Sequence, residues 1–71
     1  MEREYVESTN LASIGFDSDQ SILEVEFNRG AVWQYFDVEE SVYYELMATD
    51  SKGSYFHHNI RMGGYNASQI G

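Results

Sequence analysis

The central part of the chain alternates between hydrophobic and polar residues with a period of two. In residues 22–27 (ILEVEF), leucine, valine and phenylalanine fall on one side of an extended backbone. Glu24 and Glu26 fall on the other side and are expected to face solvent. Residues 11–17 (LASIGFD) and 31–36 (AVWQYF) follow the same rule, so all three segments are predicted to be strands with one buried face.

A glycine between the last two of these segments indicates how they pair. Residues 28–30 (NRG) predict a three-residue hairpin loop, built on a type I turn, whose last residue takes positive φ. This loop pairs Phe27 with the residue after it, and so places Trp33 and Tyr35 on the apolar face. A two-residue loop would send both rings to the glutamate face, but it would force positive φ on Arg29 as well, so we favour the first register.

The spacing of apolar residues changes after the third strand. Apolar side chains recur at every fourth position through residues 38–49, which predicts a helix whose apolar stripe covers the sheet. Asp37 precedes it as the expected N-cap. A short second helix is predicted over residues 54–61, with Ser54 as its cap.

Together these elements predict an α+β fold: a small antiparallel β-meander of about three strands, packed by one main helix and a short C-terminal helix. The 71 residues are expected to form one domain, 1–71, with an ordered core from about residue 5 to residue 61. Segments 1–4 and 65–71 are predicted to be flexible. Residues 1–10 read as an edge strand or a loose arm.

Composition removes several kinds of chemistry. The chain has no cysteine, which excludes disulfides and thiol nucleophiles. His57 and His58 are adjacent and point about 100° apart on a helix, so they cannot hold one ion together. Because no nucleophile elbow or phosphate-binding glycine motif is present, we expect no cofactor, no metal and no enzymatic activity. Residues 1–9 (MEREYVEST) lack the apolar core of a signal peptide, and no segment has the length of a membrane helix, which predicts a cytoplasmic protein with no membrane contact.

Charge is distributed unevenly along the chain. The net charge is −8, and all twelve acidic residues lie within residues 1–50. Residues 51–71 contain Lys52, Arg61 and both histidines, with no carboxylate side chain. The stretch 52–61 (KGSYFHHNIR) is therefore both basic and aromatic, a composition suited to stacking the bases of single-stranded RNA. The alternative is that its apolar residues belong to the core and its polar residues are only solvated.

The spacing of these residues along the chain also matches a known family. The matching positions run Ser13-Ile14-Gly15-Phe16-Asp17, Leu23-x-Val25-x-Phe27-x-x-Gly30, Trp33-x-Tyr35-Phe36, Val38, Val42-Tyr43, Ala48, Ser51-x-Gly53, and Tyr55-Phe56 to Ile60-Arg61. This order resembles the KTSC domain, named for the C-terminal extension of some lysyl-tRNA synthetases and also found as free-standing short bacterial and phage proteins. The family's YxY appears here as Trp33-Gln34-Tyr35, its GYD as Gly15-Phe16-Asp17, and its common helix-starting proline as Glu39.

The resemblance implies a small non-enzymatic module that binds RNA, because the family is associated with a synthetase. The residues expected to carry that binding are Lys52, Tyr55, His57 and Arg61, with Trp33 and Tyr35 if they are exposed. The alternative is a protein–protein module, of phage origin in one version, whose acidic and aromatic surface docks onto a basic partner through Glu24 and Glu26. The net charge of −8 favours the second hypothesis, and the family context favours the first. The oligomeric state stays open, because an exposed sheet edge could also pair with a second chain.

Overall fold

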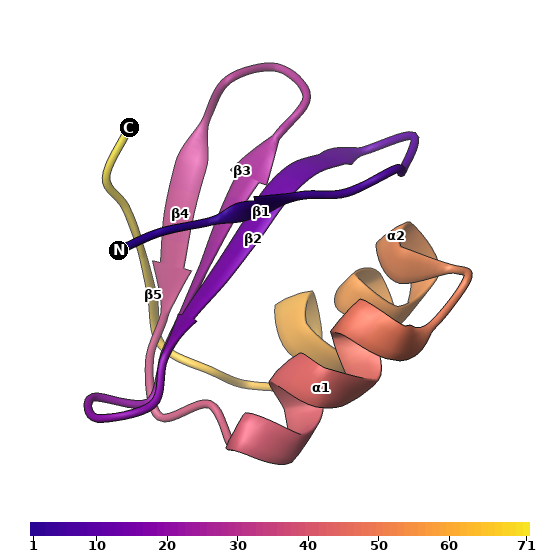
Figure 1. Cartoon of the computed structure of the whole chain (residues 1–71). Helices are drawn as coiled ribbons and strands as arrows, with labels where there is room; N and C mark the ends of the chain where they lie inside the picture. The colour runs from indigo at the N-terminus through magenta and orange to yellow at the C-terminus, as the bar shows by residue number, and fades with distance from the viewer.

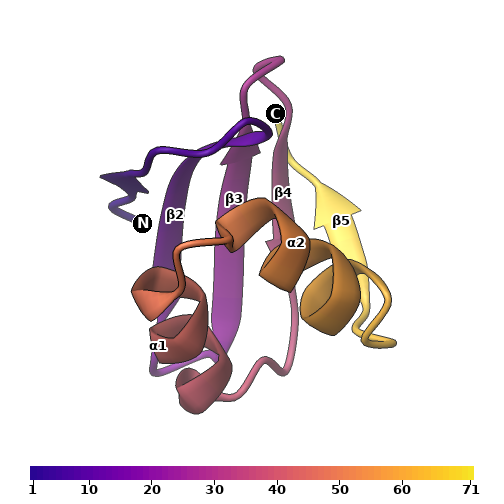
Figure 2. The ribbon, with the colours of Figure 1, turned by 90° about the vertical axis from the view of Figure 1, so that its right-hand side faces the viewer.

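The computed structural model describes residues 1–71 and contains one antiparallel sheet with helices on one face (Figure 1). The sheet order is β1 (Glu4–Tyr5), β2 (Leu11–Asp17), β3 (Ile22–Phe27), β4 (Val32–Tyr35) and β5 (Ala67–Gln69). The helices are α1 (Glu40–Ala48) and α2 (Lys52–Phe56), and α2 continues into a π-helical segment, η1 (His57–Arg61). Figure 2 shows both helices in front of the sheet. The predicted α+β meander is confirmed, with five strands in place of about three.

The β3–β4 hairpin has the predicted register. The main-chain N–H of Gly30 donates to the carbonyl oxygen of Phe27 at 2.8 Å, and Gly30 has a φ of +97°. Trp33 lies opposite Val25, and Tyr35 lies two residues further along the same face. Both rings therefore face the helices, as the three-residue loop requires.

Both ends of the chain contribute strands to the sheet: β1 lies within residues 1–10, where an edge strand or a loose arm was expected, and β5 lies within residues 65–71. Glu4 in β1 lies opposite Ile14 in β2, and β5 pairs with β4 along its length. All three residues of β5 are exposed, and so are both residues of β1. These strands are stabilised by main-chain hydrogen bonds to existing strand edges and bury little apolar surface, so they leave no alternating pattern in the sequence.

The helix α1 begins later than predicted, and its cap is different. Asp37 has a φ of +58° and lies outside the helix, and Glu39 occupies the N-cap position without a side-chain capping bond. Between them, the N–H of Val38 donates to the carbonyl oxygen of Ser21 at 3.0 Å. The chain is thus anchored to the β2–β3 turn before the helix starts, and this tertiary contact overrides the capping-box spacing.

The second helix also differs from its predicted bounds. It begins at Lys52 after the N-cap Ser51, and residues His57–Arg61 are π-helical. Phe56 and Ile60 are buried. In the basic and aromatic stretch 52–61, the apolar residues Phe56 and Ile60 therefore belong to the core, while the polar residues reach the surface.

The core lies between the sheet and the helices. Its members come from β2, β3, β4, α1, α2, η1 and the loop before α1, and they form one cluster to which β1 and β5 do not contribute. The nine buried hydrophobic residues are Leu11, Ile14, Leu23, Val25, Tyr35, Val38, Leu46, Phe56 and Ile60.

The face of the sheet away from the helices is covered by the N-terminal segment. Glu24 is only 5% exposed, and it pairs with Arg3 and accepts a hydrogen bond from Gln34 Nε2 at 2.9 Å. Ser13 Oγ receives a hydrogen bond from Arg3 and donates one to Glu26 Oε1 at 2.8 Å. The prediction that both glutamates face solvent is wrong for Glu24, because the segment crosses this face and supplies a cation to it, whereas Glu26 is half-buried.

Candidate nucleic-acid interface

A groove of about 870 Å³ opens between the β3–β4 hairpin, the segment before β2, and the α2–η1 helix. Fifteen residues line it, and none of them is Asp or Glu. The absence of Asp and Glu sets the groove apart from the rest of the chain, which carries twelve acidic residues. Five of the lining side chains are aromatic: Phe27, Trp33, Tyr35, Phe56 and Tyr65.

The groove also gathers positive charge. Arg29 on the hairpin loop and Arg61 at the end of η1 both line it, and they are two of only four Lys or Arg residues in the chain. His57 lies on the same wall as Arg61. All three side chains belong to exposed residues. The groove therefore joins two cations with an absence of carboxylates, which favours the approach of an anion.

Arg61 is held in place by aromatic rings. Its guanidinium carbon lies 5.9 Å from the ring centroid of Phe27 and 5.8 Å from that of Phe56, within the range of cation–π contacts. The two rings meet edge to face at 5.4 Å. Burial raises the pKa of the nearby Tyr35 hydroxyl, and the positive charge of Arg61 offsets part of that rise. Arg61 therefore keeps an orientation over the groove while remaining open to solvent.

The two aromatic residues of β4 have different accessibility. Tyr35 is 7% exposed and packs edge to face against Phe56 with ring centroids 5.5 Å apart. Trp33 is half-buried, and its ring lies 6.5 Å from that of Tyr35 at an interplanar angle of 27°. Trp33 can offer part of its ring to a ligand, whereas Tyr35 supports the groove from below.

The wall opposite Arg61 is fixed by hydrogen bonds from Asn28. Its Nδ2 donates to the carbonyl oxygens of Ser8 at 3.2 Å and Thr9 at 2.9 Å. Its main-chain N–H donates to Asn10 O at 2.9 Å. These bonds tie the hairpin loop to the segment before β2, so the backbone that carries Arg29 is anchored.

Four of the six residues predicted from the sequence meet in this groove, namely Trp33, Tyr35, His57 and Arg61. The sequence argument missed Arg29, because it treated that residue only as part of a turn. The signal that was available is its place in a hairpin loop next to the strand that carries Trp33, which brings it to the same end of the sheet.

Lys52 and Tyr55 lie elsewhere and bind other partners. Lys52 Nζ donates to the carbonyl oxygen of Thr49 at 2.8 Å. The Tyr55 hydroxyl donates to Glu45 Oε1 at 2.7 Å. Burial and the Glu45 carboxylate raise the pKa of Tyr55 to about 12. The two side chains are thus part of the contact between α1 and α2.

Two further properties of the chain bear on its chemistry. His57 and His58 have ring centroids 5.1 Å apart and meet edge to face, and no group of three His, Cys, Asp or Glu side chains is arranged to hold a metal ion. No helix combines the length and the apolar composition needed to cross a bilayer.

Comparison with known proteins identifies relatives over most of the chain. A family profile described as the KTSC domain matches residues 7–65. An uncharacterized protein from Stutzerimonas stutzeri (strain A1501) is 43% identical over 56 residues, 79% of each chain. A protein from Tsukamurella paurometabola is 34% identical over 50 residues, 70% of this chain and 75% of the relative. The crystal structure of a KTSC domain protein from Yersinia pestis has a TM-score of 0.91 at 35% identity, covering 99% of this chain and 97% of the other.

Proposed function

This chain belongs to the KTSC domain family, and we propose that it is a non-enzymatic, cytoplasmic module that binds single-stranded RNA in the groove between the β3–β4 hairpin and η1. One observation carries the proposal. The groove contains Arg29 and Arg61, half of the chain's Lys and Arg residues, and none of its twelve carboxylates. Phosphate contacts supply much of the affinity for nucleic acid, so a polyanion binds where cations gather and acids are absent.

The groove residues have distinct roles in this proposal. Arg29 and Arg61 contact phosphates from the two walls, and their planar guanidinium groups match phosphate geometry. Trp33 stacks an unpaired base on the accessible part of its ring. Tyr35 is too buried to stack and only positions its neighbours. Lys52 and Tyr55 are left out of the site because their polar atoms are bonded to other groups.

The alternative hypothesis, docking of a basic protein through Glu24 and Glu26, is less favoured by the contacts of these two residues. Glu24 is bonded to Arg3 and Gln34, and Glu26 accepts a hydrogen bond from Ser13. A carboxylate engaged in this way is less available to a partner in solution. An acidic docking surface has to be sought elsewhere on the molecule.

Fluorescence anisotropy with a labelled single-stranded RNA of about ten nucleotides tests the proposal. If both arginines neutralise a phosphate, the logarithm of the association constant should fall with the logarithm of salt concentration at a slope of about −1.4, since each phosphate contact contributes about −0.7 for single strands. Replacing Arg61 with methionine should lower the affinity and reduce the slope to about −0.7.

Lys52→Met is the matched control, because it removes the same charge outside the groove. It should leave the slope unchanged. An affinity that does not depend on salt, or an equal loss in Lys52→Met and Arg61→Met, would contradict RNA binding in this groove.

A further inference from the structure

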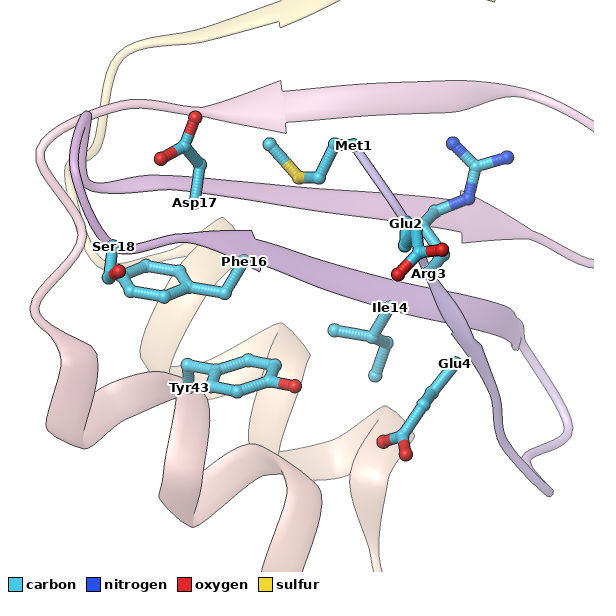
Figure 3. Close-up of a pocket in the computed structure, with 9 residues that line it drawn as sticks. All are labelled: Met1, Glu2, Arg3, Glu4, Ile14, Phe16, Asp17, Ser18 and Tyr43. Carbon is cyan, nitrogen blue, oxygen red and sulfur yellow. The ribbon is translucent and has the colours of Figure 1, made fainter.

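A second cleft, of about 840 Å³, lies beside β1 and β2 and shares no lining residue with the groove. Figure 3 shows its nine lining residues. It is formed where the N-terminal segment leaves β2, and Tyr43 of α1 closes one side. Three carboxylates line it: Glu2, Glu4 and Asp17. Its charge is therefore opposite in sign to that of the groove.

A stacked pair of aromatic rings forms the floor of this cleft. The rings of Phe16 and Tyr43 have centroids 5.2 Å apart and are nearly parallel, at 13°. Both residues are half-buried, so the pair supports a ligand without being enclosed. Figure 3 shows Glu4 on the same side of the cleft as the Tyr43 hydroxyl, and burial, Glu4 and Tyr44 all raise the pKa of Tyr43. Aromatic faces beside carboxylates are the surroundings that an ammonium or guanidinium group prefers.

Two cations also line the cleft, the guanidinium of Arg3 and the α-ammonium of Met1, so carboxylates exceed cations there by one. The guanidinium of Arg3 binds Ser13 Oγ and pairs with Glu24 on the outer face of the sheet. Figure 3 shows its side chain turned away from the carboxylates of Glu4 and Asp17. Asp17 receives hydrogen bonds only from main-chain N–H groups of its own turn, so its charge is not balanced by a cation.

The cleft also adjoins an uncovered piece of sheet edge. The N–H of Val6 donates to Ala12 O at 3.0 Å, and Glu4 lies opposite Ile14, which sets the alternation of the β1–β2 ladder. In an antiparallel ladder, alternate residues turn their main-chain groups toward the same neighbour. Ala12 and Ile14 turn their main-chain groups toward β1, and the next residue of β2 that does so is Phe16. However, β1 pairs only with Ser13 and Ile14. The main-chain N–H and C=O of Phe16 therefore point to an edge that no strand covers.

From the cleft, its aromatic floor, its charge and the open edge, we infer that this surface binds an extended, lysine- or arginine-containing segment of a protein partner. The segment adds as a strand beside Phe16, and one cationic side chain lies over the Phe16–Tyr43 pair between Glu4 and Asp17. Charge complementarity favours this occupant, because the cleft has three carboxylates against two cations, and one of those cations, Arg3, is paired with Glu24 outside the cleft. The inference does not depend on RNA binding at the groove, which shares no lining residue with this cleft.

A synthetic peptide of alternating lysine and threonine tests the inference by NMR titration of the ¹⁵N-labelled protein at low salt. The amides of Phe16, Asp17 and Tyr43 should shift, and amide hydrogen exchange at Phe16 should slow as its N–H gains a partner. Glu4→Gln should weaken binding by about two- to fivefold, the range measured for solvent-accessible ion pairs. A peptide with glutamate in place of lysine should not bind.

Glu7→Gln is the matched control, because Glu7 is exposed and lies outside the cleft. It should bind the lysine peptide as tightly as the unchanged protein does. Equal weakening by Glu7→Gln and Glu4→Gln would overturn the inference, because binding would then reflect net charge alone. Equal binding of the glutamate peptide, or shifts confined to the groove, would also overturn it. Peptide binding without slower exchange at Phe16 would overturn the strand-addition geometry.

Discussion

Replacing Arg3 with methionine tests whether the N-terminal segment is a structural part of the sheet. Arg3 pairs with Glu24 and donates to Ser13 Oγ at 2.9 Å. The side chain of Glu24 is 6% exposed and that of Arg3 is 28% exposed. The substitution keeps most of the aliphatic stem of Arg3 but leaves a nearly buried carboxylate with Gln34 as its remaining partner.

The loss of unfolding free energy expected for Arg3→Met lies between the values for a fully buried and an exposed ion pair. Removing one partner of a fully buried ion pair costs about 3–5 kcal/mol of unfolding free energy, whereas an exposed pair contributes about 0–1 kcal/mol. Because Glu24 is nearly buried and Arg3 is partly exposed, Arg3→Met should cost about 2 kcal/mol. For a domain of this size, that loss lowers the melting temperature by about 8–16 °C.

Urea denaturation of four variants measures this effect. In a Glu24→Gln background, Arg3→Met should cost less than about 0.5 kcal/mol, because the charge it paired with is gone. Arg29→Met removes the same charge from an exposed loop and should change stability by no more than about 0.5 kcal/mol. If Arg3→Met proves as neutral as Arg29→Met, the N-terminal segment contributes nothing to the fold and the reasoning is refuted.

Three further predictions follow from single positions. Gly15→Ala puts a methyl group into steric overlap with the carbonyl oxygen of Glu2, so amide exchange of residues 2–5 should accelerate; unchanged exchange would contradict the packing. Gly30→Ala should cost about 1–2 kcal/mol in urea denaturation, because Gly30 has a φ of +97° and nothing else hinders a methyl group there; an unchanged midpoint would refute this. The pKa of Tyr55 is raised from 10.0 to about 12, so the stability it contributes is complete below pH 10 and is lost as pH rises toward 12. Tyr55→Phe should reduce that loss and remove the last-titrating phenol from the phenolate absorbance curve; an unaltered curve would contradict the assigned contact with Glu45.

The strands with an apolar face could be predicted from the sequence. The period of two in β3, together with the need for positive φ at Gly30, was enough to place Trp33 opposite Val25. Local pattern determines these features, because the hairpin pairs segments that are neighbours in the chain.

The features that the sequence did not predict depend on contacts between distant segments. β5 bonds to a strand edge through its main chain, which leaves no side-chain signal, and for β1 the sequence left the choice between an edge strand and a loose arm open. Glu24 is buried because Arg3 crosses the sheet, and a strand pattern carries no information about that crossing. Asp37 has the spacing of a helix cap, but the bond from Val38 to Ser21 holds the chain outside the helix at that point.

Only part of the candidate site was predicted from the sequence, because the rest also depends on contacts between distant segments. Trp33 and Arg61 could be singled out by residue type and by the charge of the segment around Arg61. Arg29 was missed although the predicted hairpin places it near Trp33, because the sequence did not show that the loop and Arg61 line one groove. Lys52 and Tyr55 had the right chemistry, but the helix directs them to Thr49 and Glu45.

Titration of the ¹⁵N-labelled protein with single-stranded RNA at low salt is the most direct test of the proposed function. The account predicts that the indole N–H of Trp33 and the amides around Arg29 and Arg61 shift together, and that added salt reverses the shifts. The amides of Phe16 and Tyr43, which line the other cleft, should stay unchanged. No shift at Trp33 or Arg61, or shifts that added salt leaves in place, would contradict RNA binding in the groove.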